Sequence, residues 1–280
     1  MGSSIRIEPA AAGCGAVVHG VDLAKMDDET WATVHRAFLE HGVIFFRDQD
    51  LAPDAHIALA RRFGPIVVNK FFPESDVSTE IAEVRKEPEQ QTNIGGGWHT
   101  DHSYDEVPAK GSILVARELP SEGGDTLFAN MHAAYEALSE GLKRTLCTLR
   151  AVHSNDHLYG EYGIYHKTDL AGMLQGKDLV GRAVHPVVIR HPETGRPALY
   201  VNPGHTRGFE GWTVEESLPL LQFLYAHASS DAFTCRFEWA PGSVAIWDNR
   251  STWHMAMNDY HGQRRLLHRI TIDGVALEAA

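Results

Sequence analysis

Two residues that can bind a metal ion, His99 and Asp101, lie two positions apart, with one residue between them, in the segment Trp98–Asp101. On a strand, or at its frayed end, side chains two positions apart point to the same side. A chelating pair of this kind needs a third ligand from elsewhere, and His254 is the candidate. Two histidines and one carboxylate on one face of a metal ion leave its other coordination positions open for exchangeable ligands. The sequence therefore predicts an open metal site.

Two arginines on one expected strand suggest what else the site could bind. The H-x-D spacing alone is weak evidence in a chain with 17 histidines. It fits both a non-haem Fe(II) oxygenase and a zinc hydrolase. Arg265 and Arg269 are four positions apart, so on a strand they face the same side. They could belong to a solvated face with internal ion pairs. Inward guanidinium groups instead need an anion, and arginine grips carboxylates with two parallel hydrogen bonds.

Composition narrows the class of protein and of partner. The 280 residues carry a formal net charge of −12, which argues against a non-specific nucleic-acid binder. Three cysteines without a C-x-x-C pair predict neither a disulfide framework nor a zinc–thiolate site, and they suit a reducing cytoplasm. We expect a cytoplasmic protein, because the sequence shows no signal peptide and no apolar run long enough to span a membrane.

The pattern of elements predicts a single domain over residues 1–280, mainly β with flanking helices and a sandwich or barrel core. Residues 87–97 form either a flexible surface loop or a lid over the metal site, and residues 155–181 are long, aromatic and irregular. Helices are expected after Asp27, from Pro53, within 130–149, and from Thr213, which with Glu216 forms a capping box. Strands are expected within 5–23 and at 43–46, 112–116, 126–128, 184–189, 198–201, 233–237, 244–247, 253–257 and 266–272.

Several short segments, in order along nearly the whole chain, resemble the TauD/TfdA (taurine dioxygenase) family of Fe(II)- and 2-oxoglutarate-dependent dioxygenases. Their combination is far more specific than H-x-D alone. The matching segments are Phe45–Gln49, Arg62–Gly64, Trp98–Asp101, Leu119–Thr126, His185–Val188, His191–Pro192, Tyr200–Asn202, Trp247–Arg250 and Arg265–Arg269.

The resemblance implies a double-stranded β-helix (jelly-roll) core and a named set of ligands. By it, His99, Asp101 and His254 bind Fe(II). Thr126 and Arg265 hold the distal carboxylate of the cosubstrate 2-oxoglutarate. O2 oxidises a substrate while 2-oxoglutarate is converted to succinate and CO2. The protein would position the reactants and exclude water.

The substrate residues match the family less well. Arg269, which meets the sulfonate in the taurine enzyme, is kept. The other positions that resemblance assigns to the substrate carry different residues here, namely Asn69 (or Lys70, if the alignment slips by one), Phe72, Gly95, His102, Tyr159 and His205. A site that loses its hydrogen-bond donors binds a small sulfonate poorly.

We therefore expect a small organic acid other than taurine: an aryl or alkyl carboxylate, a sulfonate or a sulfate ester. Phe71, Phe72, Tyr104 and Tyr159 favour a bulky or aromatic body, although these residues could be ordinary packing. Hydroxylation next to a heteroatom would cleave a C–S or C–O bond. The alternatives are a catalytically idle binding protein on the same fold and a zinc hydrolase. By analogy with the family, the partners would be a small acid and copies of the chain in a dimer or tetramer, without nucleic acid or membrane.

Overall fold

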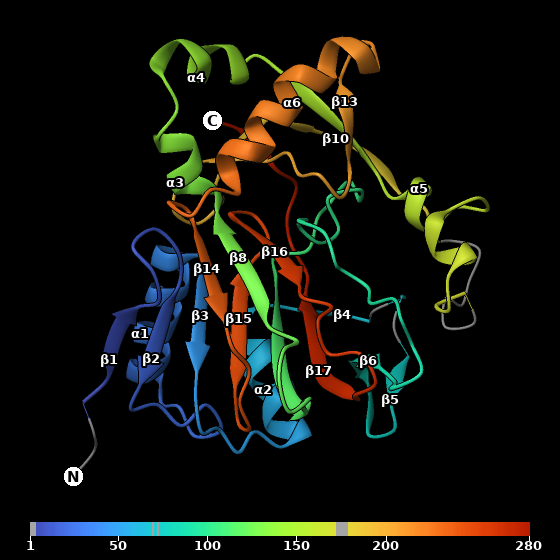
Figure 1. The fold of residues 1–280 in the computed structure, drawn as a ribbon. Coiled ribbons are helices and arrows are strands. Elements are labelled where there is room, and N and C mark those ends of the chain that lie inside the picture. The colour runs from blue at the N-terminus through green and yellow to red at the C-terminus, as the bar shows by residue number, and fades with distance from the viewer. Residues whose placement is uncertain (1–3, 69, 72, 172–178) are drawn as a thin grey trace.

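A nine-stranded sheet forms the larger layer of the computed structural model, which describes residues 4–68, 70–71, 73–171 and 179–280. Its strand order is β1-β2-β3-β15-β7-β17-β6-β5, and β4 pairs with β17 (Figure 1). The strands are β1 (Arg6–Pro9), β2 (Ala16–His19), β3 (Val43–Phe46), β4 (Ile66–Val67), β5 (Glu74–Ser75), β6 (Ser78–Lys86), β7 (Gly111–Glu118), β15 (Val244–Asp248) and β17 (Arg265–Ile272).

Three smaller sheets of three strands each complete the described β-structure. One, with the order β14-β8-β16, packs against the large sheet. It contains β8 (Thr126–Asn130), β14 (Thr234–Phe237) and β16 (Thr252–Ala256). The other two have the orders β10-β9-β13 and β12-β11-β18. They contain β9 (Arg150–Ser154), β10 (Arg182–Pro186), β11 (Val188–Arg190), β12 (Pro197–Leu199), β13 (Thr206–Phe209) and β18 (Glu278–Ala279).

The helices lie outside the facing sheets. α1 and α2 pack on the outer face of the large sheet, and α3, α4 and α6 gather at the opposite end of the molecule (Figure 1). Asp27 caps α1 by accepting from the Thr30 amide, and the predicted capping box of α6 is confirmed between Thr213 and Glu216. The helices are α1 (Asp28–His41), α2 (Pro53–Phe63), α3 (Met131–Glu136), α4 (Glu140–Leu146), α5 (Asp156–Tyr159) and α6 (Val214–Ala228), with a 3-10 turn η1 (Ile164–Lys167).

Strand β3 shows why the two layers hold together. All four of its residues are fully buried, as the apolar run predicted. Because side chains alternate along a strand, Ile44 and Phe46 enter the core beneath α1 and α2, whereas Val43 and Phe45 enter the core between the sheets. There the Phe45 ring stacks on Phe237 of β14 at 4.2 Å between centroids. This two-layer packing confirms the predicted mainly β, jelly-roll core with flanking helices.

The sequence did not predict every strand correctly. β6 is nine residues long, but its burial does not alternate, and charged residues interrupt its apolar positions. β9 and β13 are short and pair with each other across a bulge. The expected strand 184–189 divides into β10 and β11 around Val187. These strands depend on partners that are distant in the sequence, so local pattern says little about them.

No helix among the described residues combines the length and the apolar character that a membrane crossing would require.

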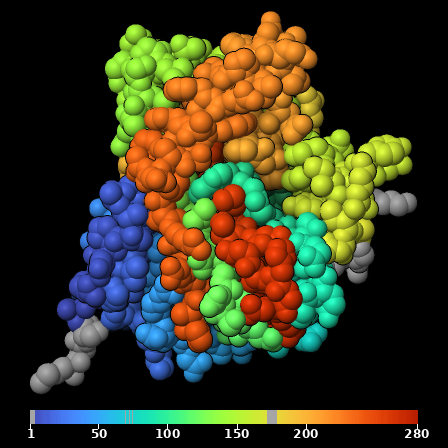
Figure 2. Space-filling model, in the orientation of Figure 1, coloured from blue at the N-terminus to red at the C-terminus, as the bar shows by residue number. Residues whose placement is uncertain are grey.

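Figure 2 shows the segment of residues 155–171, in yellow-green, beside the teal segment that leads into the predicted metal ligands.

Candidate metal centre and active site

Two of the three predicted metal ligands are cross-strand partners. His99 forms an antiparallel bridge with His254 of β16, in which each backbone N–H donates to the other residue's carbonyl, at 3.1 and 2.8 Å. Directly opposed residues of an antiparallel pair project to the same face. The two imidazole rings consequently lie with their centroids 4.1 Å apart.

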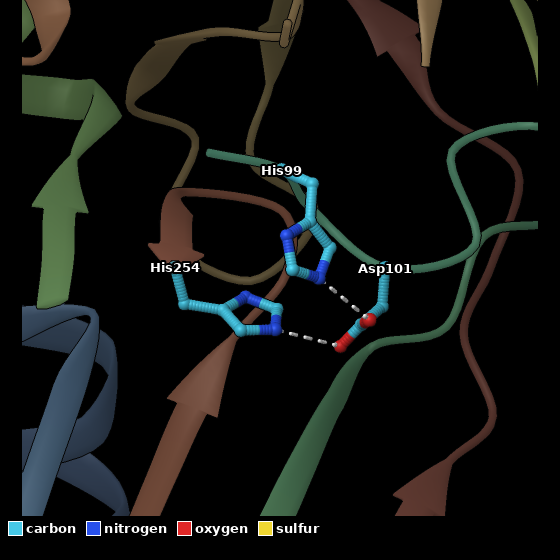
Figure 3. A group of neighbouring side chains, drawn as sticks. All are labelled: His99, Asp101 and His254. Atoms are coloured by element: carbon cyan, nitrogen blue, oxygen red, sulfur yellow. Dashed lines mark ion pairs between the residues drawn. The ribbon is translucent and has the colours of Figure 1, made fainter. Parts of the chain in front are cut away.

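Asp101 completes the group from the turn that follows the bridge. Its Oδ1 lies 3.6 Å from His99 Nε2, and its Oδ2 lies 3.5 Å from His254 Nε2 (Figure 3). One ligand atom from each residue lies within 4.8 Å of the others. The predicted proximity of the H-x-D pair is thus present, with His99 at the frayed end of a pairing and Asp101 just beyond it.

The surroundings hold these groups in the protonation states that a metal ion needs. His99 Nδ1 donates to the Gly97 carbonyl at 2.8 Å, which leaves the Nε2 lone pair facing Asp101 and His254. Burial lowers the pKa of His254 well below its usual value. Burial alone would raise the pKa of Asp101, but Arg269 and His254 hold it well below the ordinary range. Neutral imidazole and ionised carboxylate are the forms that bind metal ions.

Arg265 and Thr126 form a cradle beside this group. Arg265 is 4% exposed, and in the described part of the chain its Nε and Nη2 have no hydrogen-bond partner. A Cβ at Gly124 would lie 3.1 Å from Arg265 Cδ, so the glycine makes room for the guanidinium. Trp239 Nε1 donates to Thr126 Oγ1 at 3.0 Å. A buried guanidinium with unpaired donors needs an anion, and a carboxylate suits its geometry.

One cavity, of about 170 Å³, joins the predicted metal ligands, the Arg265 cradle and most of the predicted substrate residues. The predicted residues that line it are His99, Asp101, His254, Thr126, Arg265, Arg269, Gly95, His102, Tyr159 and His205. Asn69 and Phe72 lie outside the described residues, and the alternative Lys70 is exposed.

Arg269 contacts the metal group directly. Its Nη2 donates to Asp101 Oδ2 at 2.6 Å and to Ser112 Oγ at 2.9 Å. The guanidinium also lies over the Trp247 ring, 5.6 Å from its centroid. Arg265 and Arg269 both reach the cavity and are both buried, which confirms the prediction that they face inward on one strand.

The positions where the sequence departs from the taurine enzyme shape the cavity. Gly95 has a φ of +81°, and a Cβ there would come within 3.1 Å of His99 Cε1. A side chain at Gly95 would therefore press on a predicted metal ligand. His102 adopts a φ of 58°, and its Nδ1 pairs with Asp105 Oδ2 at 2.9 Å. His205 is buried, its Nδ1 has no hydrogen-bond partner among the described residues, and its ring meets Tyr104 edge-on.

An apolar wall faces these polar groups. Phe71 packs on Tyr159 with ring centroids 4.7 Å apart, and it also contacts Tyr104. Sequence reasoning singled out these three aromatic residues. It missed several other lining residues, because isolated apolar side chains in loops and strands carry no sequence signal that separates lining from core. The missed residues are Val84, Ile94, Leu114, Leu158, Tyr165 and Trp247.

A buried ion network supports the site from behind. Thr100, between His99 and Asp101, donates to the Asn249 carbonyl at 2.6 Å. The neighbouring Asp248 pairs with Arg250 at 2.6 Å, and Arg250 also reaches Glu193 at 2.8 Å. Lys110 Nζ also lies 2.9 Å from Glu193 Oε1, and His35 Nε2 lies 3.2 Å from Glu193 Oε2. The turn between β15 and β16 is thereby fixed, and β16 carries His254.

Comparison with known proteins agrees with this geometry. The model of the family described as "Taurine catabolism dioxygenase TauD, TfdA family" matches residues 6–271. The chain is 37% identical to an (S)-phenoxypropionate/alpha-ketoglutarate-dioxygenase of Sphingobium herbicidovorans, covering 98% of this chain and 96% of the relative. It is also 37% identical to an alkylsulfatase of Acinetobacter baylyi, covering 93% of this chain and 82% of the relative.

A solved structure extends the comparison to the fold. The crystal structure of a taurine dioxygenase from Burkholderia xenovorans matches with a TM-score of 0.83 and 35% identity, covering 99% of this chain and 93% of that one.

The jelly-roll core with an His-Asp-His group defines an oxygenase scaffold, and the chain belongs to the TauD/TfdA family. It is an Fe(II)- and 2-oxoglutarate-dependent dioxygenase, an oxidoreductase that uses O2. The family assignment decides against the alternatives of an idle binding protein and a zinc hydrolase.

The ion network behind the site predicts how stability depends on pH. Hydrogen bonding from His35, with Lys110 and Arg250, lowers the pKa of Glu193. A lowered folded-state pKa stabilises the protein above the unfolded-state value of about 4.3, and this contribution is lost as the pH falls through the folded-state pKa. Glu193→Gln should lower the urea midpoint at pH 7, and the difference from wild type should shrink progressively below about pH 4.5.

Glu210→Gln provides the control, because it removes one partner of a half-exposed ion pair with Arg150 at 3.3 Å. Its urea midpoint should stay close to that of the wild type at every pH, within about 0.5 kcal/mol in unfolding free energy. A difference between Glu193→Gln and wild type that does not change with pH would contradict the proposed linkage.

Proposed function

We propose that His99, Asp101 and His254 bind the Fe(II) ion of this dioxygenase, and that Thr126 and Arg265 bind the distal carboxylate of 2-oxoglutarate. The observation that carries the proposal is that the three side chains able to bind a metal ion converge on one cavity with Arg265, whose Nε and Nη2 have no partner among the described residues. Two imidazole nitrogens and one carboxylate are the donor set that non-haem Fe(II) sites use. The residues present therefore fit both groups.

When bound, Fe(II) would supply the oxidative decarboxylation of 2-oxoglutarate to succinate and CO2, coupled to hydroxylation of the substrate. The chain's own residues position the reactants. Arg265 orients the cosubstrate from inside the core, and the Gly97 carbonyl holds His99 in its binding tautomer. Arg269 keeps Asp101 ionised and presents a cation to the cavity. The aromatic wall excludes water from the reacting groups.

Loss of one ligand tests the metal assignment. Under anaerobic conditions, Fe(II) and 2-oxoglutarate together should give the wild-type protein a weak visible charge-transfer band. His99→Ala should abolish the band and lower succinate formation by more than about 100-fold, since even outer-shell changes at metal sites cost 10–100-fold.

His261→Ala is the matched control, because His261 is exposed and is not among the residues that line the cavity. This variant should keep both the band and the activity. A His99→Ala protein that retained the wild-type band would exclude His99 as a ligand, and activity with zinc alone would contradict the iron assignment.

We infer that the substrate is a small organic acid with a bulky or aromatic body, and that taurine is turned over poorly. Arg269 would bind the acid group, assisted by His102 and His205, while Phe71, Tyr104 and Tyr159 would enclose the apolar part. Gly95 supports the inference, since it offers no side-chain donor and a Cβ there would crowd the His99 ring. The names of the two relatives, an (S)-phenoxypropionate dioxygenase and an alkylsulfatase, point to organic acids of this kind.

A substrate screen separates the possibilities. With succinate formation as the readout, (S)-2-phenoxypropionate and hexyl sulfate should exceed taurine by more than about tenfold in kcat/KM, because a site without the sulfonate donors loses small polar substrates. Product mass distinguishes hydroxylation from cleavage, since cleavage of the aryl ether would release phenol. Taurine turnover equal to that of the larger acids would overturn the inference.

The remaining sequence predictions stay predictions: one domain over residues 1–280, a cytoplasmic location, no nucleic-acid or membrane partner, and a homo-oligomer. Exposed apolar side chains on and before α6, among them Trp212, Val214, Leu218 and Phe223, support a dimer or tetramer. Sedimentation equilibrium would test it, and a monomer at micromolar concentration would contradict it.

A further inference from the structure

A second buried cation lies opposite the proposed cosubstrate residue. Lys86 of β6 is the direct cross-strand partner of Arg265 of β17, and the two residues are 3% and 4% exposed. Directly opposed residues of an antiparallel pair project to the same face, where like charges repel. Asn258 Oδ1 lies 2.6 Å from the Lys86 Nζ, and the face of Tyr260 lies 4.5 Å from it. Burial lowers the pKa of Lys86, and the charge of Asp169 acts in the opposite direction. Tyr260 also faces the Arg265 guanidinium, at 5.9 Å.

Hydrogen bonds continue from Lys86 towards the surface. Asn258 Nδ2 donates to the carbonyl of Gln91 at 2.8 Å. The amide of Gln91 donates to the Asp169 carboxylate, which also accepts from the Thr92 amide at 3.3 Å. One backbone position of the segment 87–97 is therefore held from two sides, by Asn258 on its carbonyl and by Asp169 on its amide.

The two segments that these bonds join both cover the cavity. Ile94 and Gly95 line it from the segment 87–97, and Leu158, Tyr159 and Tyr165 line it from the segment 155–171. A second connection lies next to the proposed metal ligands, where the Gly95 carbonyl accepts from the amide of Ala256, two residues beyond His254. Tyr165 lines the same cavity as Gly95. Figure 2 shows the two segments side by side, in teal and yellow-green.

We propose that Lys86, Asn258 and Asp169 form a relay that couples 2-oxoglutarate binding at Arg265 to closure of the segments 87–97 and 155–171 over the substrate. The inference rests on the proposed function of Arg265. The distal carboxylate of 2-oxoglutarate offsets the repulsion between Arg265 and Lys86. Lys86 then keeps its hydrogen bond to Asn258, and Asn258 keeps its hydrogen bond to the Gln91 carbonyl. The Gln91 amide in turn keeps its hydrogen bond to the Asp169 carboxylate. The three relay residues are positioning residues, since none of them lines the cavity.

The coupling must be reciprocal. If the cosubstrate favours the closed segments, then closing them favours the cosubstrate by the same factor. Breaking the relay should therefore weaken 2-oxoglutarate binding, although Arg265 and Thr126 are untouched. Couplings of this type commonly amount to about 5–150-fold.

Hydrogen exchange of the segment 87–97 provides the test, because the Gln91 and Thr92 amides themselves donate to Asp169. In the full-length protein with Mn(II) and without O2, saturating 2-oxoglutarate should slow exchange in this segment by at least about fivefold. In Asn258→Ala and Asp169→Ala the slowing should fall below twofold, and the Kd of 2-oxoglutarate should rise several-fold. Asp169→Asn keeps an acceptor oxygen and should restore part of the effect.

Glu161→Ala is the matched control, being an exposed acidic residue of the same segment, and it should behave as wild type. Unchanged circular dichroism and thermal midpoints would show that the relay variants are folded. If the wild type binds 2-oxoglutarate without slower exchange in 87–97, or if the relay variants match it, the relay is wrong. If the wild type does not bind 2-oxoglutarate at all, the proposed function fails instead.

Discussion

The backbone bridge between His99 and His254 is the constraint on which the site depends. It places two side chains from distant parts of the chain on one face, with both N–H···O bonds exchanged. A one-residue slip of β16 would turn His254 to the opposite face. The neighbouring Trp253 prevents this slip, because it is 1% exposed and belongs to the core beneath α6. The register of the site is therefore enforced by packing on its far side.

Buried positive charge is concentrated on the neighbouring strands β6 and β17. Arg265, Arg269 and Lys86 are all buried, and of these Arg269 forms an ion pair with a carboxylate, Asp101, in the described residues. Removing cations from water costs several kcal/mol each unless a partner compensates. An arrangement of this kind reduces stability in the unliganded protein and gives anionic ligands a large favourable interaction. Deviations from ordinary core rules are expected where a protein binds its reactants.

The parts of this arrangement that local sequence could predict are those set by local physics. The alternation of side chains placed Arg265 and Arg269 on one face, and the apolar run Val43–Phe46 predicted a strand buried on both sides. Capping chemistry predicted the start of α6. β6 could not be predicted, since its stability comes from pairing with β17 and β5 rather than from its own pattern. The role of Lys86 follows from that pairing and was therefore missed as well.

The site has two parts whose residues are constrained by the fold to different degrees. This difference explains why the sequence predicted the reaction class but did not identify the substrate. The residues proposed to bind the metal and the cosubstrate lie on or beside paired strands, where a change of register would disrupt the core. Part of the proposed substrate wall, including Ile94, Gly95 and Tyr159, comes from the segments 87–97 and 155–171, which lie mostly outside the paired strands. Asn258 and Asp169 lie where these parts meet. A coupling between cosubstrate and lid residues can therefore persist while the substrate-facing side chains vary, because it acts mainly through the backbone of Gln91 and Thr92.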